Sequence, residues 1–232
     1  MIKIIGHRGA MGYAPENTLR SFRKLLKLNV DMVELDAYLC KSGELVVIHD
    51  FKVDRTTNGS GYVMEKTLTE LKKLNAGKIE EIPTLREVLD LIDRQVKVNI
   101  ELKGTNTAKP VHELIEYYVN NLNWEYNDFL ISSFNHYELR EFIKLNPHIK
   151  IGALITGIPI GYAEFAEKVN AFSVHPSIEF INQDFVDDTH NRGMQVYVWT
   201  VNDWDDIKRM KDLGVDGMIS NYPDRIKKIN KY

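Results

Sequence analysis

The sequence of 232 residues contains a single cysteine, Cys40. An internal disulfide needs two cysteines and a thiolate metal cluster needs several, so both are excluded. A lone cysteine is typical of a chain kept in a reducing compartment, and we interpret Cys40 as a small, half-buried apolar side chain. We therefore expect a cytoplasmic protein.

Long apolar runs and a strong excess of one charge are also missing. No stretch approaches the ~18 consecutive apolar residues of a membrane-spanning helix, and no secretion signal precedes the first segment IKIIG. The formal net charge is −3, and the 30 Lys and Arg residues are spread along the chain. Nucleic-acid binding needs a concentrated basic face, so we expect no nucleic-acid partner and no membrane span, and we leave a homo-oligomer open.

Short β-rich segments, most of them separated by helical patterns, recur along the chain. This alternation indicates βαβ units and a parallel sheet, and the chain length is near the lower limit of a (β/α)₈ (TIM) barrel. We therefore predict an α/β fold, a TIM barrel, in a single domain over residues 1–232. The predicted strands are 2–6, 31–37, 44–50, 96–102, 129–134, 150–155, 171–174, 195–201 and 216–220.

Nine strands are one more than the barrel needs, and the surplus lies beside the shortest link. Only CKSG separates LDAYL, at the end of the second apolar segment, from ELVVIHD at 44–50, and a link this short can join strands only as an antiparallel hairpin. We predict that 44–50 folds back as an extra arm beside the second barrel strand. Residues 51–83, with an NGSG turn and a short capped helix, are interpreted as a small rim insertion without a core of its own.

Charged and histidine side chains interrupt the apolar strands at their C-terminal ends, where an α/β barrel carries its active site. Glu34 and Asp36 have the i,i+2 spacing that puts both side chains on one face of a strand, and Glu101 and Lys103 share this spacing. Counting from the hairpin turn places His49 near the level of Glu34 and Asp36. The residues concerned are His7, Arg8, Glu34, Asp36, His49, Asp50, Glu101 and Lys103.

These residue types together suit metal-assisted hydrolysis or elimination. Converging carboxylates need a positive charge among them, and oxygen ligands favour Mg²⁺ or Ca²⁺. Histidines suit general acid–base work, Arg8 can clamp an anion, and Gly6 and Gly9 are expected to let backbone and substrate approach closely. Taken singly, each pattern also fits a plainer reading, as solvated carboxylates, a strand-edge ion pair or a turn.

Ten motifs, in order from one end of the chain to the other, resemble those of the glycerophosphodiester phosphodiesterase family, within the phospholipase C-like phosphodiesterase barrel superfamily. The ordered set is far more specific than any one member. The motifs are HRG at 7–9, APENT at 14–18, ELDA at 34–37, VVIHD at 46–50, RTTNGSG at 55–61, IPTL at 82–85, IELK at 100–103, ISSF at 131–134, VYVWTVN at 196–202 and DGMISNYP at 216–223.

The resemblance implies the central residues of an active site. His7 and His49 match the family's catalytic histidine pair. Glu34, Asp36 and Glu101 match its ligands for one divalent cation, Mg²⁺ or Ca²⁺. The implied reaction is metal-dependent hydrolysis of a glycerophosphodiester to sn-glycerol 3-phosphate and an alcohol, by paired-histidine acid–base catalysis.

The resemblance also implies residues that hold the substrate. Arg8 and Lys103 match groups that face the phosphate. Phe134 and Trp199 match aromatic positions flanking the glycerol end, although core packing is an alternative for either. Glu16 is expected to support the residues that contact the substrate.

Asn17 is expected to have the same role as Glu16. For both, a helix N-terminus that starts at Pro15 is the alternative interpretation. Two other functions also stay open. One is a lysophospholipase D or phosphoinositide phospholipase-type activity on the same barrel, for which the apolar stretch 154–165 would serve acyl chains. The other is a non-catalytic glycerophosphodiester-binding protein.

Overall fold

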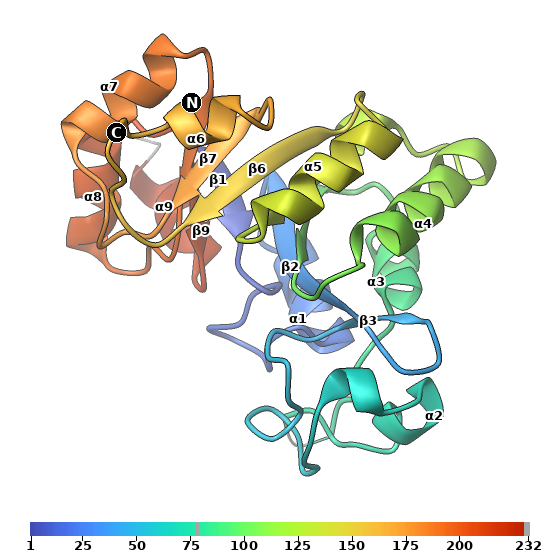
Figure 1. Ribbon diagram of the computed structural model, residues 1–232. Coiled ribbons are helices and arrows are strands. Elements are labelled where there is room, and N and C mark those ends of the chain that lie inside the picture. The colour runs from blue at the N-terminus through green and yellow to red at the C-terminus, as the bar shows by residue number, and fades with distance from the viewer. Residues whose placement is uncertain (78, 230–232) are drawn as a thin grey trace.

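A computed structural model describes residues 1–77 and 79–229, and shows a closed parallel barrel (Figure 1). In this part of the chain nine strands form one sheet, in the order β1-β9-β8-β7-β6-β5-β4-β2-β3, and pairing of β1 with β2 closes eight of them into a barrel. The predicted fold class is confirmed. The barrel strands are β1 (Lys3–Gly6), β2 (Met32–Leu39), β4 (Lys97–Leu102), β5 (Phe129–Ser133), β6 (Lys150–Ile155), β7 (Ser173–Pro176), β8 (Gln195–Val198) and β9 (Gly217–Ser220).

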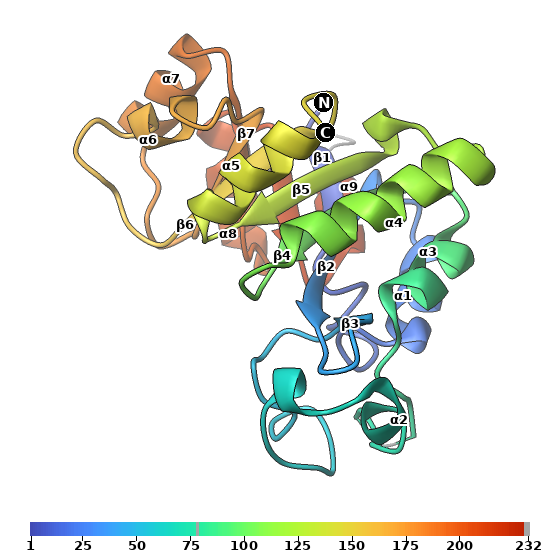
Figure 2. The ribbon, with the colours of Figure 1, turned by 45° about the vertical axis from the view of Figure 1, so that its right-hand side comes forward.

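Helices cover the outside of the barrel, as the second view shows (Figure 2). Their starts are set by local capping: Thr18 accepts a hydrogen bond from the Ser21 backbone N–H at the start of α1, and Thr84 and Glu87 form a capping box on α3. No helix within 1–77 and 79–229 combines the length and apolarity needed to cross a membrane. The helices are α1 (Leu19–Leu26), α3 (Leu85–Ile92), α4 (Ala108–Asn121), α5 (His136–Leu145), α6 (Glu164–Glu167), α7 (Gln183–Asn191), α8 (Trp204–Asp212) and α9 (Pro223–Ile229), with a 3₁₀ turn η2 (Tyr126–Asp128) before β5.

Alternation along β2 decides which side chains enter the barrel. Val33 and Leu35 belong to the core between the barrel and its helices. Met32 instead packs with interior residues of β1, β5, β8 and β9, including Tyr197. Because Glu34 and Asp36 share the orientation of Met32, they point into the barrel on the mouth side of this apolar layer.

Strand β3 (Leu45–Val47) is the extra arm that the short link predicts. It pairs antiparallel with β2, with Ala37 opposite Val47. The strand is shorter than the predicted 44–50, because beyond Val47 only the Ile48 backbone N–H still bonds to the Asp36 carbonyl, at 3.0 Å. That bond keeps the next residue, His49, near the level of Asp36.

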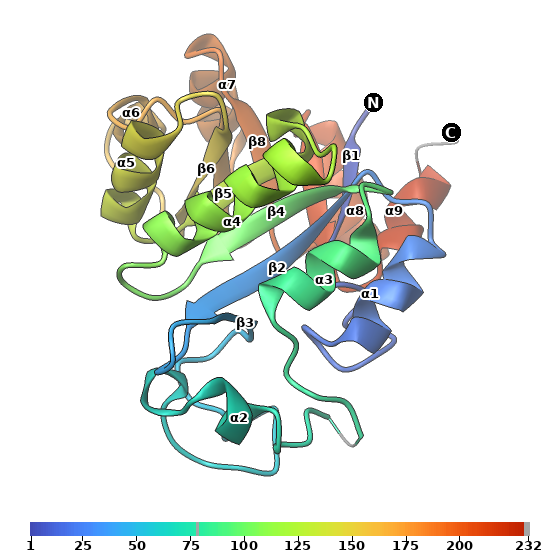
Figure 3. The ribbon, with the colours of Figure 1, turned by 90° about the vertical axis from the view of Figure 1, so that its right-hand side faces the viewer.

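The insertion at 51–83 projects from the mouth end of the barrel, opposite the N-terminus (Figures 1 and 3). It contains a 3₁₀ turn, η1 (Val63–Glu65), and the helix α2 (Leu68–Leu71). Its apolar side chains are buried in a small cluster that they share with the arm, so the expectation that the insertion lacks a core of its own stays a prediction. The cluster consists of Cys40, Val46, Ile48, Val53, Val63, Leu71, Ala76 and Ile82.

The single-domain interpretation of 1–232 stays a prediction. Residues 78 and 230–232 fall within it and lie outside the described residues.

Candidate active site

A cavity of about 390 Å³ opens at the C-terminal mouth of the barrel. It brings together eight of the residues singled out from the sequence, while Asp36 sits directly behind its wall and Glu16 and Asn17 lie behind Arg8 and Asp36. The lining residues are His7, Arg8, Glu34, His49, Asn99, Glu101, Lys103, Ser132, Phe134, Leu154, Trp199 and Ile219.

Glu34, Asp36 and Glu101 form a compact acidic cluster. Asp36 and Glu101 are register partners on the adjacent strands β2 and β4, and one carboxylate oxygen from each of the three residues lies within 4.8 Å of the others. All three side chains are buried. Three converging carboxylate oxygens are the donor set that a hard divalent cation prefers, so the residues present fit a bound Mg²⁺ or Ca²⁺.

The electrostatics of the cluster favour the same conclusion. Burial and the nearby Asp36 charge raise the pKa of Glu34 well above its usual value and that of Glu101 to about 8. Burial would also raise the pKa of Asp36, but Lys103 and Arg8 hold it below its usual value. The two glutamates therefore need further positive charge to be ionised at neutral pH, which a divalent cation supplies.

Two basic side chains lie against this cluster. Lys103 Nζ is 2.7 Å from Glu101 Oε1 and 3.4 Å from Asp36 Oδ1. Arg8 Nε is 3.5 Å from Asp36 Oδ2, and the Arg8 backbone N–H donates to Glu34 Oε2 at 2.9 Å. Both side chains also line the cavity, so each offers positive charge to a bound anion.

The glycines around His7 and Arg8 allow a close approach to a neighbouring helix. A Cβ on Gly6 would lie 1.8 Å from Leu25 Cδ1, and a Cβ on Gly9, whose φ is +83°, would lie 2.4 Å from Ser21 Oγ. Both neighbours belong to α1. These glycines therefore permit a close approach between the β1 end and α1, and a close approach of substrate stays a prediction.

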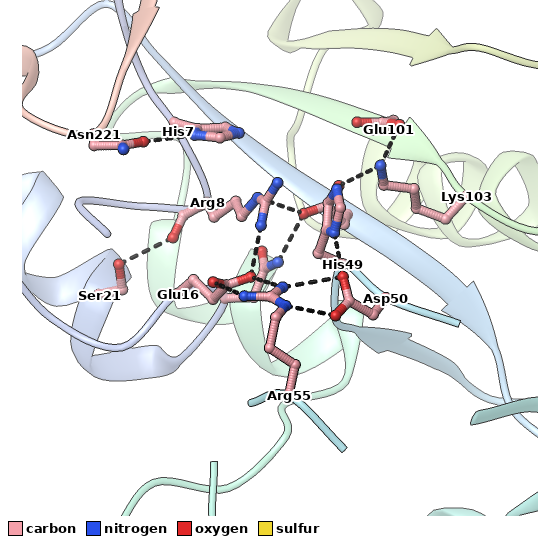
Figure 4. Close-up of polar contacts among 12 residues, drawn as sticks. His7, Arg8, Glu16, Ser21, His49, Asp50, Arg55, Glu101, Lys103 and Asn221 are labelled. Atoms are coloured by element: carbon pink, nitrogen blue, oxygen red, sulfur yellow. Dashed lines mark hydrogen bonds and ion pairs between the residues drawn. The ribbon is translucent and has the colours of Figure 1, made fainter. Parts of the chain in front are cut away.

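The two histidines line the cavity and have different partners behind them (Figure 4). His7 Nδ1 lies 2.7 Å from Asn221 Oδ1, whereas His49 Nδ1 lies 2.6 Å from Asp50 Oδ1. A carboxylate only accepts, so His49 Nδ1 donates to it, and the other ring nitrogen, Nε2, is left for a reactant. Burial and the Arg8 charge lower the pKa of His7 to about 4, and burial also lowers the pKa of His49.

Asn221 and Asp50 contact the histidines, although the sequence pattern predicts no role for either. The position of each in the sequence could have pointed to the site. Asn221 follows the last barrel strand directly, where the other polar site residues were found, and Asp50 is adjacent to His49.

The PENT segment lies directly behind the cavity. Asn17 Nδ2 donates to Asp36 Oδ2 at 2.8 Å, and Glu16 Oε1 accepts from Arg8 Nη1 at 2.7 Å. Helix α1 begins at Leu19 with Thr18 as its N-cap, so Pro15 does not start a helix and that alternative is wrong.

Two aromatic rings also line the cavity. Phe134 and Trp199 meet edge to face, with ring centroids 5.5 Å apart, and Trp199 Nε1 donates to the His175 carbonyl at 2.9 Å. The Lys103 ammonium lies 5.6 Å from the Phe134 ring centroid. Phe134 is 42% exposed, which excludes a core-packing role for it.

Comparison with known proteins identifies relatives over nearly the whole chain. The family model described as "Glycerophosphoryl diester phosphodiesterase family" matches residues 7–225. A glycerophosphodiester phosphodiesterase from Caldanaerobacter subterraneus is 41% identical, covering 96% of this chain and 95% of its own, and one from Bacillus altitudinis is 37% identical, covering 100% and 99%. A phosphodiesterase from Oleispira antarctica, solved in complex with the product sn-glycerol-3-phosphate, superposes with a TM-score of 0.88 at 31% identity, covering 99% of this chain and 97% of its own.

Proposed function

The chain belongs to the glycerophosphoryl diester phosphodiesterase family, and on that premise we propose that it hydrolyses glycerophosphodiesters to sn-glycerol 3-phosphate and a free alcohol. One observation carries the proposal: a single cavity is lined by two glutamates of the buried acidic cluster, two histidines, two basic side chains and an aromatic pair. The product bound by the Oleispira relative supports the glycerol phosphate half of this assignment.

Substrate binding divides between the two sides of the cavity. Arg8 and Lys103 would hold the phosphate, because they are the cationic side chains that line it. Phe134 and Trp199 would pack against the carbon atoms of the glycerol. Glu34, Asp36 and Glu101 would hold a divalent cation, which supplies positive charge that polarises a phosphate oxygen and an adjacent hydroxyl.

The partners of the two histidines suggest their order of action. Asp50 places a full negative charge beside the His49 ring and so stabilises its protonated form, whereas the neutral Asn221 amide oxygen supports a protonated His7 only by accepting a hydrogen bond. We therefore assign His7 as the first base and His49 as the first acid. His7 Nε2 takes the proton of the glycerol 2-hydroxyl, its oxygen bonds to phosphorus, the bond to the leaving alcohol breaks, and His49 gives that alcohol a proton.

The second half of the reaction exchanges these roles. His49, now neutral, takes a proton from water as the water oxygen attacks phosphorus. The bond from phosphorus to the glycerol 2-oxygen breaks, and His7 returns its proton to that oxygen. The products are sn-glycerol 3-phosphate and the alcohol released in the first step, and both histidines return to their starting states.

A substrate panel tests this function. Glycerophosphocholine, glycerophosphoethanolamine and glycerophosphoglycerol should be turned over with kcat/KM values within about tenfold, a spread of roughly 1.4 kcal/mol, because the polar groups of the cavity address the phosphate and glycerol. A diester lacking the glycerol 2-hydroxyl should bind without being cleaved. Normal hydrolysis of that analogue would rule out the internal nucleophile, and binding of all three diesters without turnover would favour a binding protein.

A lysophospholipid is the second candidate substrate, and one loop favours it. Leu154 lines the cavity, and the loop after β6 carries Ile158 and Ile160, which are 44% and 105% exposed. These side chains offer an apolar path away from the phosphate site. Release of choline from lysophosphatidylcholine at a rate matching glycerophosphocholine would establish this activity.

A further inference from the structure

Arg55 lies in the insertion and does not line the cavity, yet it joins two parts of the active site (Figure 4). Its guanidinium donates to both oxygens of Asp50, from Nε at 2.6 Å and Nη2 at 3.0 Å. It also donates to both oxygens of Glu16, from Nη1 and Nη2 at 2.8 Å each. Four hydrogen bonds thus link one side chain to two carboxylates from separate segments.

Each of these carboxylates contacts a residue of the cavity. Asp50 Oδ1 accepts from His49 Nδ1 at 2.6 Å, and Glu16 Oε1 accepts from Arg8 Nη1 at 2.7 Å. Arg55 is therefore one contact removed from a histidine that faces the reactants and from an arginine that faces the phosphate.

The positive charge of Arg55 offsets the negative charges of Asp50 and Glu16. Asp50 and Glu16 are both held by the same guanidinium, so without it two carboxylates would face each other across a short gap. Hydrogen bonding to Arg55 is the largest cause that lowers the pKa of Asp50 to about 2, so this carboxylate stays ionised and accepts from His49. An ionised Asp50 fixes the ring tautomer in which Nε2 is free.

We propose that Arg55 is a positioning residue, which holds His49 and Arg8 in their working orientations by clamping Asp50 and Glu16. The planar, forked guanidinium is suited to this task because it can bind two carboxylates in a bidentate manner, which a lysine ammonium cannot. The insertion would thereby act on catalysis without touching the substrate. This inference rests on the proposed function for its kinetic readout.

The main test replaces Arg55 and supplies the missing group from solution. Arg55→Ala should lower kcat by about 10²-fold, since misplacing a catalytic group by about 1 Å has an effect of this size. Millimolar guanidinium should raise the kcat of Arg55→Ala at least tenfold, while methylammonium should not raise it. Arg55→Lys should stay well below wild type, because it keeps the charge and loses the fork.

Arg209→Ala is the matched control. The Arg209 side chain is 47% exposed, close to the 48% of Arg55, and it also bonds to a nearby carboxylate, that of Asp206. It lies on α8, outside the network, so its removal should leave kcat unchanged with or without guanidinium.

Two further variants separate the effect of Arg55 on His49, through Asp50, from its effect on Arg8, through Glu16. Asp50→Asn should lower kcat mainly, because it acts through His49, and Glu16→Gln should raise KM mainly, because it acts through Arg8. Either change combined with Arg55→Ala should cost less than the product of the single effects, since both remove the same interaction.

A spectroscopic readout keeps the inference testable without turnover. The His49 Nδ1 proton should give a low-field ¹H NMR resonance, identified by its absence from His49→Gln, and this signal should vanish or move upfield in Arg55→Ala and Arg55→Gln. A wild-type kcat in Arg55→Ala, or a loss of kcat with the resonance unchanged, would overturn the inference. If wild type cleaves no glycerophosphodiester, the proposed function fails, whereas the resonance still reports whether Arg55 holds the His49–Asp50 pair.

Discussion

The polar and the apolar residues that line the cavity come largely from different halves of the chain. The polar wall, made of His7, Arg8, Glu34, His49, Asn99, Glu101 and Lys103, comes from the first 103 residues, and Ser132 of β5 is the polar lining residue outside that half. The apolar wall, made of Phe134, Leu154, Trp199 and Ile219, comes from β5 onward. A closed barrel brings both to one mouth because β1 pairs with β2 on one side and with β9 on the other. The difference suggests that one half of the chain carries the chemistry and the other shapes the substrate site.

Removing the cation should have the largest effect, because it disables the polar wall as a whole. Exhaustive dialysis against EDTA should abolish hydrolysis, and Mg²⁺ or Ca²⁺ should restore it. Glu34→Ala should resemble the chelated enzyme while keeping its circular dichroism spectrum. Full activity after dialysis into EDTA would mean that the acidic cluster does not act through a metal.

Replacing either histidine should have the second largest effect, because each change removes one group of the polar wall. His7→Ala and His49→Ala should each lower kcat/KM at least ~10²-fold, the usual contribution of an acid or base. In the double variant the losses should not multiply, because the pair acts as a unit. A His49→Ala enzyme within a few-fold of wild type would show that the β3 arm carries no chemistry.

Changes in the apolar wall should be smaller and of a different kind. Phe134→Ala and Trp199→Ala should raise KM about tenfold with kcat nearly kept, which corresponds to roughly 1.4 kcal/mol of lost binding. Initial rates over a range of glycerophosphocholine concentrations measure both parameters. A drop in kcat as large as that of the histidine variants would erase the distinction between the two walls.

The smallest effect concerns the stability of the chelated protein. The pKa of Glu101 is about 8, above its unfolded value, so its contribution to stability is lost as pH rises through 8. Burial lowers the pKa of His7 from 6.5 to about 4. This shift makes the stability of the folded state rise with pH between these two values, and it adds no pH dependence above about 6.5. Between pH 6.5 and 8 the midpoint of thermal unfolding should therefore fall in EDTA and fall less with Mg²⁺ or Ca²⁺. Scanning calorimetry at several pH values checks this, with a Glu101→Gln variant as the matched control.

The sequence was sufficient for the barrel and for most of the polar wall. Strands and helices alternate visibly, the four-residue link CKSG permits only a hairpin, and charged side chains such as Glu34 interrupt apolar strands at one end. Other features depend on contacts between distant residues. The Leu25 contact that requires Gly6 to be glycine is invisible until α1 is docked on β1.

The insertion shows the same limit. The small cluster that it shares with the arm joins Cys40 to Leu71 and Ile82, residues too far apart for any periodicity to reveal the contact. Arg55 was missed for a related reason. It ends no strand, and its importance appears only when Glu16 and Asp50 are seen to meet on it.

The attachment of the β3 arm has a consequence for how the protein loses activity. On its inner edge β3 pairs with β2, and on its outer edge, within residues 1–77 and 79–229, its backbone is held by one bridge between Val46 and Thr84 and a bond from the Val47 N–H to the Pro83 carbonyl. The barrel closes through direct pairing of β2 with β4, so the arm can open while every barrel ladder stays intact. Amide hydrogens of the arm should therefore exchange faster than those of β2 and β4. Inactivation by heat or denaturant should precede global unfolding, because His49 leaves the site with the arm.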